Sequence, residues 1–252
     1  MKQTLIVLFA FFIQTGVNAQ TGHGDSIRAT RPDSAIKVDF SDDWAQLHKY
    51  RDANMALPAG DTNSRIVFLG SSIFEFWSER MPEYFKQHPN YVNRGISGQI
   101  SGQLLIRFQQ DVIALHPKVV VILAGSNDIS GDKGHVTDET ILNNVRSMVE
   151  LARLHHITPV ICLYLPIGQY PWRKEVQAVP RIKSLNESLT RFASQNNLAV
   201  IDYFSPLADS NNAQKAELTI DGVHPNKAGY EIMARVTDVA IKKLWLPRNY
   251  PL

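Results

Sequence analysis

Hydrophobic and polar positions along the chain follow two alternating patterns. Short runs of mostly apolar residues recur, and such runs are typical of strands that are buried on both faces of a sheet. The segments between them carry an apolar residue at every third or fourth position, which predicts amphipathic helices. Strands are expected at 66–69, 91–93, 119–123, 160–165 and 199–202, and helices at 43–57, 73–81, 101–115, 137–155, 181–195 and 226–244. This alternation favours an α/β domain with a parallel sheet covered by helices on both faces.

The N-terminal residues do not follow this pattern. Lys2 is the only charged residue within 1–19, an apolar run extends from Leu5 to Ile13, and Val17-Asn18-Ala19 has the small residues of a cleavage site. These features are typical of a secretory signal peptide that is cleaved before Gln20. The apolar run is shorter than the roughly 20 residues that a membrane-spanning helix needs. We therefore expect an exported protein, periplasmic or extracellular, without stable membrane insertion after the signal is removed.

Four segments are expected from these patterns. Residues 1–19 form the signal peptide, 20–60 a polar leader with one helix, 61–245 a single folded domain and 246–252 a C-terminal tail. Two connections within the domain, 129–135 and 167–180, are longer than the fold requires, and long connections of this kind are usually functional or mobile.

Composition excludes several kinds of function. The 252 residues are 44% hydrophobic and 20% charged, as in soluble globular proteins. A net charge of +2 without a dense basic stripe argues against a nucleic-acid partner. Cys162 is the single cysteine and lies in an apolar run, so we expect a buried thiol and no intrachain disulfide. No cluster of histidines and carboxylates predicts a metal site.

The strand expected at 66–69 leads into Gly70-Ser71-Ser72 and then into a helix. A strand, a tight turn and a helix place a side chain at the carboxyl edge of a parallel sheet, where open α/β folds bind ligands. A serine at the N-terminus of a helix can act as a nucleophile, and the N–H groups there can hold an oxyanion. The alternative is that one of these serines only caps the helix.

Three further polar sites follow strands or precede a helix. Asp221 and His224 are three residues apart in one loop, and a carboxylate beside a histidine can orient it and stabilise its protonated form. Asn127 and Gly98 each follow a strand and can supply donors to an oxyanion. Taken singly, these are also common features of surface loops and turns. Together with Ser72 they make up a complete set for acyl transfer at one edge of the sheet.

The order of these motifs resembles that of the SGNH (GDSL-type) hydrolase family. Its four blocks match Gly70-Ser71-Ser72, Ile96-Ser97-Gly98, Gly125-Ser126-Asn127 and Asp221-Gly222-Val223-His224, and the resemblance covers about residues 61–245. It implies a single flavodoxin-like domain of three α/β/α layers with a central parallel sheet. It also implies a serine hydrolase that cleaves esters without a cofactor.

The resemblance assigns roles to residues of this chain. Ser72 would be the nucleophile, His224 the general base and then acid, and Asp221 its orienting carboxylate. The backbone N–H groups of Ser72 and Gly98 and the side chain of Asn127 would form the oxyanion hole. Two positions depart from the family pattern, because Ser71 and Gln99 stand where many members carry aspartate. The first departure leaves two adjacent serines, with Ser71 as the alternative nucleophile.

Aromatic residues indicate where a substrate could bind. Trp77 in the first helix of the domain, and Tyr170 and Trp172 in the connection 167–180, are expected to line a sugar or acyl pocket, with core or lid packing as the alternative. The function expected is a secreted esterase that acts on a small-molecule or glycan ester, foremost a short-acyl (acetyl) ester of a carbohydrate. Within the resembled family, a lysophospholipase or phospholipid acetylhydrolase activity is the alternative. From another class, the alternative is a carbohydrate-binding protein without catalysis.

Overall fold

A computed structural model of the chain describes residues 43–58 and 64–245. The expected signal peptide at 1–19, the leader up to residue 42 and the tail at 246–252 lie outside the described residues. Among the described helices, none combines the length and the apolar character that crossing a bilayer requires.

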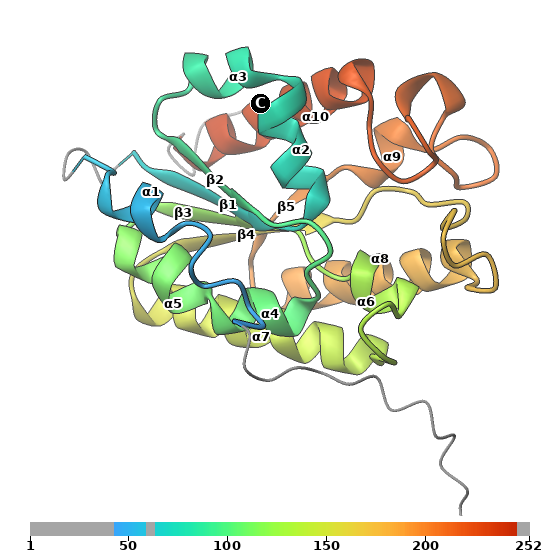
Figure 1. Cartoon of the computed structure of the whole chain (residues 1–252), viewed down its shortest axis with the longest axis horizontal. Helices are drawn as coiled ribbons and strands as arrows, with labels where there is room; N and C mark the ends of the chain where they lie inside the picture. Colours follow the sequence, from blue (N-terminus) through green and yellow to red (C-terminus); the bar gives the residue numbers. More distant parts are fainter. Residues whose placement is uncertain (1–42, 59–63, 246–252) are drawn as a thin grey trace, which may run out of the picture. The chain divides into compact units, whose positions relative to one another are not determined.

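One parallel sheet forms the centre of the described residues (Figure 1). Its strands are β1 (Ile66–Gly70), β2 (Tyr91–Gly95), β3 (Val119–Ile122), β4 (Thr158–Leu163) and β5 (Ala199–Asp202), in the spatial order β2-β1-β3-β4-β5. Every residue of β1 and of β3 is buried, as expected for inner strands that are covered on both faces. The expected α/β fold with a central parallel sheet is confirmed.

Helices lie on both sides of this sheet (Figure 1). On one side are α2 (Ser72–Arg80), α3 (Pro82–Gln87) and α10 (Lys227–Trp245), and on the other are α4 (Ser101–Ile106), α5 (Phe108–Asp111), α7 (Asp138–Leu154) and α8 (Ala178–Gln195). Two short helices, α6 (Ser126–Ser130) and α9 (Phe204–Leu207), follow β3 and β5. The 3-10 turns are Ile113–Leu115 and Ala216–Leu218.

Most of the expected helices are found with small shifts at their ends. Helix α7 begins after Thr137, whose Oγ1 accepts the N–H of Thr140 at 3.1 Å and so caps the helix as predicted. Helix α8 begins three residues before the predicted start at 181. Helix α3 was not predicted, and Pro82 at its first position is typical of a helix start.

Two predictions of helices are wrong in part. The helix expected at 43–57 is only α1 (Arg51–Met55), because 43–50 forms turns in which Gln46 has a φ of 55°. The helix expected at 101–115 is divided into α4, α5 and the turn 113–115. The first division is at Arg107, whose side chain is drawn into a buried polar cluster.

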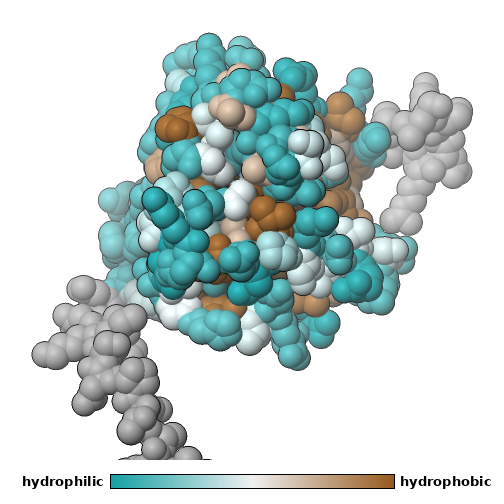
Figure 2. Space-filling model, turned by 90° about the vertical axis from the view of Figure 1, so that its right-hand side faces the viewer, coloured by the Kyte–Doolittle hydropathy of each residue, from teal (hydrophilic) through white to brown (hydrophobic). Residues whose placement is uncertain are grey.

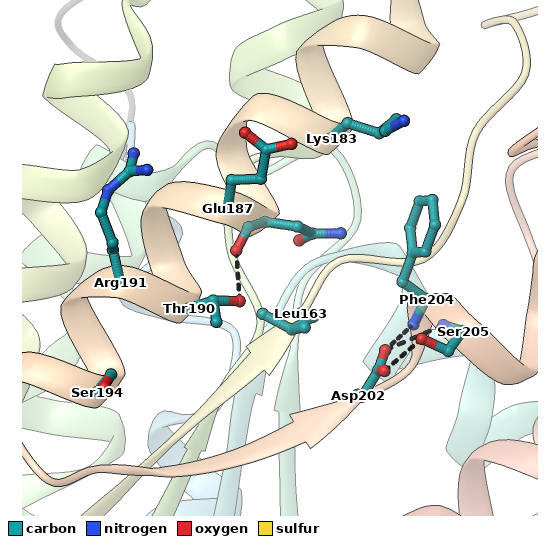
Figure 3. Close-up of a pocket in the computed structure, with 10 residues that line it drawn as sticks. Leu163, Lys183, Glu187, Thr190, Arg191, Ser194, Asp202, Phe204 and Ser205 are labelled. Atoms are coloured by element: carbon teal, nitrogen blue, oxygen red, sulfur yellow. Dashed lines mark hydrogen bonds between the residues drawn. The ribbon is translucent and has the colours of Figure 1, made fainter.

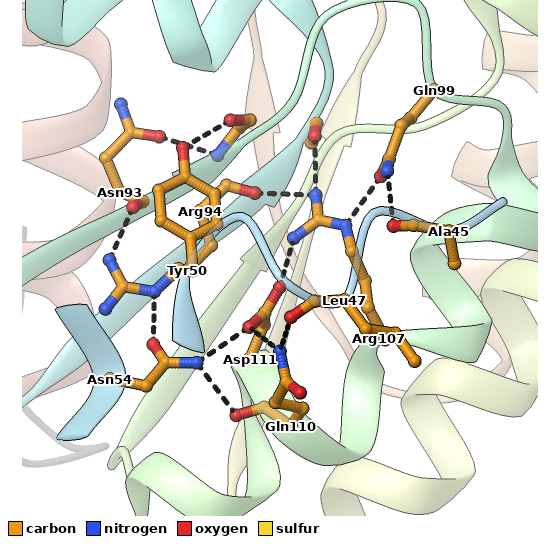
Figure 4. Close-up of polar contacts among 12 residues, drawn as sticks. Ala45, Leu47, Tyr50, Asn54, Asn93, Arg94, Gln99, Arg107, Gln110 and Asp111 are labelled. Carbon is orange, nitrogen blue, oxygen red and sulfur yellow. Dashed lines mark hydrogen bonds and ion pairs between the residues drawn. The ribbon is translucent and has the colours of Figure 1, made fainter. Parts of the chain in front are cut away.

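The guanidinium group of Arg107 is the centre of this cluster (Figure 4). It pairs with Asp111 at 2.9 Å, and the two side chains are 0% and 1% exposed. It also donates to the carbonyl oxygens of Gly70 at 3.0 Å and Arg94 at 2.6 Å, and to Oε1 of Gln99 at 2.6 Å. One side chain therefore joins the C-terminal ends of β1 and β2 to the helices below them.

We predict that Asp111→Ala lowers the free energy of unfolding by about 3–5 kcal/mol, because it leaves a buried guanidinium without its counter-charge. The measurement is equilibrium unfolding in urea. The control is Glu83→Ala, which removes a carboxylate from an exposed ion pair within one helix: the Glu83 and Lys86 side chains are 70% and 69% exposed. The control should change the unfolding free energy by about 1 kcal/mol or less. Equal effects of the two substitutions would contradict the prediction.

Candidate active site

Ser72 is the first residue of α2, and only Ser71 separates it from Gly70, the last residue of β1. Gly70 makes this turn possible, because a Cβ there would lie 2.7 Å from the ring of Phe74 and 3.1 Å from the carbonyl oxygen of Leu123. The turn aims the Ser72 hydroxyl at the loop before α10, where Oγ lies 3.0 Å from Nε2 of His224. A serine oxygen within hydrogen-bonding distance of a histidine nitrogen is the geometry of an activated nucleophile.

His224 is held on its other side by Asp221. The distance from Nδ1 of His224 to Oδ2 of Asp221 is 2.7 Å. The other carboxylate oxygen accepts the N–H groups of Val223 at 2.9 Å and His224 at 2.7 Å, in a loop that turns at Gly222 with a φ of 83°. Burial raises the pKa of Asp221, but the hydrogen bonds from His224 and from the two backbone N–H groups outweigh it and hold the pKa below its usual value. Asp221 is therefore ionised at neutral pH and suited to orient the imidazole.

The two adjacent serines have different surroundings. The Ser72 hydroxyl contacts His224, whereas the Ser71 hydroxyl lies with that of Ser126 near the buried phenol of Tyr164, whose pKa is raised by burial to about 12. Ser71 itself is the N-cap residue of α2. The geometry thus brings Ser72, and not Ser71, to the histidine.

Strand register brings the Gly98 and Asn127 loops to the same edge as Ser72. Gly70 pairs with Gly95 in β2, Leu69 pairs with Ile122 in β3, and the N–H of Ile96 continues the ladder by donating to the Gly70 carbonyl at 3.1 Å. The residues that follow these three strands therefore lie next to one another.

Gly98 and Asn127 present donors from these loops. Gly98 has a φ of 73°, and its N–H donates to no acceptor within residues 43–58 and 64–245. Asn127 uses one amide hydrogen in a 2.9 Å bond to the carbonyl oxygen of Gln99. Its second amide hydrogen is left for a ligand, because a primary amide carries two. These loops can therefore offer backbone and side-chain donors to an oxyanion.

Gln99, one of the two positions that depart from the resembled pattern, makes structural contacts. Its side chain is buried, donates to the carbonyl oxygen of Ala45 at 2.8 Å and accepts from Nε of Arg107 at 2.6 Å. A neutral amide can make both bonds at once, whereas a carboxylate has no hydrogen to donate.

Two of the three aromatic residues predicted to contact substrate do not reach it. Trp77 is fully buried and stacks on Tyr84 with ring centroids 5.0 Å apart. Tyr170 is also fully buried, and its hydroxyl donates to the carbonyl oxygen of Ser126 at 3.0 Å. Both predictions are corrected: these rings pack in the core, because their apolar faces are enclosed by other side chains.

Trp172 does lie beside the site. Its ring is 44% exposed and stacks on that of His224, with centroids 6.1 Å apart and an angle of 27°. Its Nε1 donates to Asp132 at 2.8 Å, so the two long connections predicted to be functional contact each other next to His224. A role of Trp172 in substrate binding stays a prediction.

Two residues near the site escaped the sequence analysis. Phe76 packs against His224 with centroids 5.2 Å apart, and Glu75 accepts the N–H of Ser97 at 2.6 Å. Their spacing of three and four residues from Ser72 places all three on one face of α2. This spacing in the sequence could have indicated that Glu75 and Phe76 lie near the nucleophile.

A surface pocket elsewhere in the domain does not belong to this site (Figure 3). It has a volume of about 620 Å³ and is lined by residues of α8 and of the segment 202–205. Ser72, Asn127 and His224 are not among the residues that line this pocket. The described ranges hold no group of three or more histidines, cysteines or carboxylates that could hold a metal ion. Cys162 is buried, as expected.

Comparison with known proteins identifies similar sequences and structures. The sequence model of the GDSL-like lipase/acylhydrolase family matches residues 68–232. A candidate acylhydrolase from Bacteroides fragilis NCTC 9343 has 40% identity and a TM-score of 0.78, with 81% of this chain and 99% of that chain covered. A GDSL-like lipase from Bacteroides thetaiotaomicron VPI-5482 has 38% identity and a TM-score of 0.77, with 79% and 98% covered.

A curated relative is similar over a shorter segment. The uncharacterized lipoprotein YqeF of Bacillus subtilis (strain 168) is 33% identical over 79 residues, which are 30% of this chain and 32% of that protein. The matched segment thus spans about a third of that relative's length.

Proposed function

Because this chain belongs to the GDSL-like lipase/acylhydrolase family and is an ester-hydrolysing enzyme, we propose that it is an exported serine esterase that removes short acyl groups from carbohydrates. The observation that carries the proposed mechanism is the hydrogen-bonded series from Ser72 through His224 to Asp221. A nucleophile, a base and an orienting carboxylate in this arrangement are the requirements of acyl transfer through a covalent intermediate.

In the proposed reaction Ser72 Oγ attacks the ester carbonyl carbon and its proton passes to Nε2 of His224. The negative charge that develops on the carbonyl oxygen is held by the N–H groups of Ser72 and Gly98 and by the Asn127 amide. His224 then returns the proton to the leaving alkoxide, which departs as the alcohol. A water molecule, deprotonated by His224, attacks the acyl-enzyme; His224 then returns this proton to Ser72 Oγ as the bond to the acyl carbon breaks, which releases the carboxylic acid and restores the serine hydroxyl. Asp221 stabilises the imidazolium formed in each half of the reaction.

Surface character supports a short acyl group. Figure 2 looks onto the side where the connections that follow β4 and β5 lie, and hydrophobic residues there form small patches between hydrophilic ones. A long acyl chain needs an extended apolar lining, so this surface fits a small acyl group better. The exposed face of Trp172 beside His224 can pack on the apolar face of a sugar ring. A lipid ester is the second candidate substrate, because the Bacteroides thetaiotaomicron relative is named a GDSL-like lipase.

Export is supported by the sequence of residues 1–19 and by the name of the Bacillus relative, which is a lipoprotein. We predict that the protein recovered outside the cytoplasm begins at Gln20, because Val17-Asn18-Ala19 is the cleavage signal. N-terminal sequencing of the protein after expression in a secreting host is the measurement. Recovery of uncleaved protein in the cytoplasmic fraction alone would overturn the proposal of export.

We predict that Ser72→Ala lowers kcat on an acetyl aryl ester by about 10⁴–10⁶-fold, as loss of a serine nucleophile does. Ser71→Ala is the matched control and should stay within about tenfold of the wild type, because the nucleophile and its contact with His224 remain. Initial rates on aryl esters from acetyl to long-chain acyl, followed by acetylated glycans, are the measurement.

The same series separates the alternatives. Fastest turnover of acetyl esters supports the short-acyl proposal, and fastest turnover of long-chain esters transfers the assignment to lipid substrates. An inactive Ser71→Ala beside an active Ser72→Ala would make Ser71 the nucleophile. Glycan binding without turnover of any ester would identify a binding protein.

We predict that Trp172→Ala lowers kcat/KM on an acetylated glycan by about tenfold, because a sugar ring loses a packing surface worth about 1.4 kcal/mol. On a small acetyl aryl ester the change should be less than about threefold, since that substrate has no sugar ring to pack on Trp172. Trp245→Ala is the control, because Trp245 is also an exposed tryptophan but is the last residue of α10 and not part of the connection 167–180. Equal losses on both substrates would contradict a role of Trp172 in recognising the carbohydrate.

A further inference from the structure

The segment of residues 43–58, here called the N-terminal strap, contacts the loop that carries Gly98. The hydroxyl of Tyr50 donates to the carbonyl oxygen of Gly95, and Nε2 of Gln99 donates to that of Ala45 at 2.8 Å. Lys49 forms an ion pair with Glu75 of α2. The strap is thus attached to both ends of the loop 95–99 and to the helix that begins with Ser72.

Glu75 uses its two carboxylate oxygens for different partners. Oε2 accepts the N–H of Ser97 at 2.6 Å, and Oε1 accepts from Nζ of Lys49. The Glu75 side chain is only 13% exposed. Burial raises the pKa of Glu75, but the bonds from Lys49 and Ser97 outweigh it and bring the pKa below its usual value. An ionised, largely buried acceptor makes a strong hydrogen bond to a backbone N–H.

The end of β2 is packed tightly against α2 at the same place. Asn93 donates to the carbonyl oxygen of Phe74, and its side-chain oxygen accepts the N–H of Gly95 at 2.9 Å. A Cβ at Gly95 would lie 2.2 Å from the backbone nitrogen of Glu75, so only glycine permits this approach. The chain therefore leaves β2 along α2 and reaches Ser97 directly beside Glu75.

A second set of bonds attaches the strap to β2 (Figure 4). Asn54 accepts from Nε of Arg94 at 2.7 Å and donates to Asp111 at 2.8 Å. Among the described strands β2 pairs with β1 alone. β2 is therefore an edge strand of the described sheet, and the strap holds its last two residues, Arg94 and Gly95.

We propose that Glu75, held by Lys49 of the strap, is a positioning residue for ester hydrolysis: it fixes the loop so that the Gly98 N–H points to the oxyanion formed at Ser72. This inference rests on the proposed function. Glu75 touches neither substrate nor nucleophile, and it acts through the Ser97 N–H, one residue before Gly98. Oxyanion donors are effective only when they are oriented before the reaction, so loosening the loop weakens binding of the transition state more than binding of the substrate.

The test compares Glu75→Ala with Glu83→Ala, which removes the same side chain from an exposed Lys–Glu pair on the neighbouring helix. Glu75→Ala should lower kcat on an acetyl aryl ester by about 10–100-fold, less than the loss of an oxyanion donor itself, with KM within about threefold. Binding of an alkyl boronic acid, which forms a tetrahedral adduct with the active serine, should weaken by a similar factor. Glu83→Ala should leave all three quantities unchanged.

Conservative and partner variants complete the experiment. Glu75→Gln keeps an oxygen that can accept the Ser97 N–H, and it should recover kcat to within about tenfold of the wild type. Lys49→Met should lower kcat by about three- to tenfold, because Glu75 loses the group that holds it, whereas Lys86→Met should have no effect. These two variants keep the proposal testable if Glu75→Ala does not fold, which urea unfolding of each variant will show.

The outcomes distinguish this inference from the proposed function. If Ser72→Ala retains full activity, the assigned nucleophile is wrong and the positioning role is overturned with it. If Ser72→Ala is inactive while Glu75→Ala and Lys49→Met match their controls, the proposed mechanism stands and only the role of Glu75 is overturned. A fall in unfolding free energy with unchanged kcat and boronic acid affinity would assign Glu75 to stability alone.

Discussion

The pairing of β1 with β2 on one side and β3 on the other is the constraint on which the candidate active site depends. Because the three strands are parallel and in the observed register, the residues after Gly70, Gly95 and Ile122 emerge at one edge of the sheet. Burial of every residue of β1 and β3 makes a shift of this register costly, since it would expose apolar side chains. Packing of the core strands thereby places the nucleophile, the Gly98 loop and Asn127 next to one another.

Buried polar groups stiffen this edge where backbone pairing ends. Arg107 donates to the carbonyl oxygens of Gly70 and Arg94, the positions at which β1 and β2 give way to loops. The Gly70 carbonyl also accepts the N–H of Ile96 at 3.1 Å, so the guanidinium adds a charged donor to a carbonyl that is already paired. The cluster around Arg107 thus holds the ends of β1 and β2 from below the sheet, while Glu75 and Asn93 hold the loop after β2 from the α2 side. The loops near Ser72 are therefore fixed from both faces.

The sequence predicted the strands well, and it also indicated the contact of His224 with Asp221, because both depend on local features. Buried parallel strands appear as apolar runs, and Asp221 and His224 are close enough in the chain for one loop to hold them. The helices predicted at 43–57 and 101–115 were wrong in part, because tertiary contacts of segments such as the one around Arg107 decided the backbone there. Trp77 and Tyr170 were misplaced for a related reason: an aromatic residue at helical spacing or in a loop has the same pattern whether it faces the core or a ligand.

Helix α2 shows how a short segment can organise several parts of such a site. Ser72, Glu75 and Phe76 lie on one face of it, and they contact His224, the Ser97 N–H and the ring of His224, respectively. A rotation of this helix would therefore disturb the nucleophile, the bond to the Ser97 N–H and the packing of the imidazole at once. Packing of the fully buried Trp77 on Tyr84 and Tyr230 resists such a rotation. Trp77, which was expected to contact the substrate, thus contributes to the site indirectly, by holding the helix that carries Ser72.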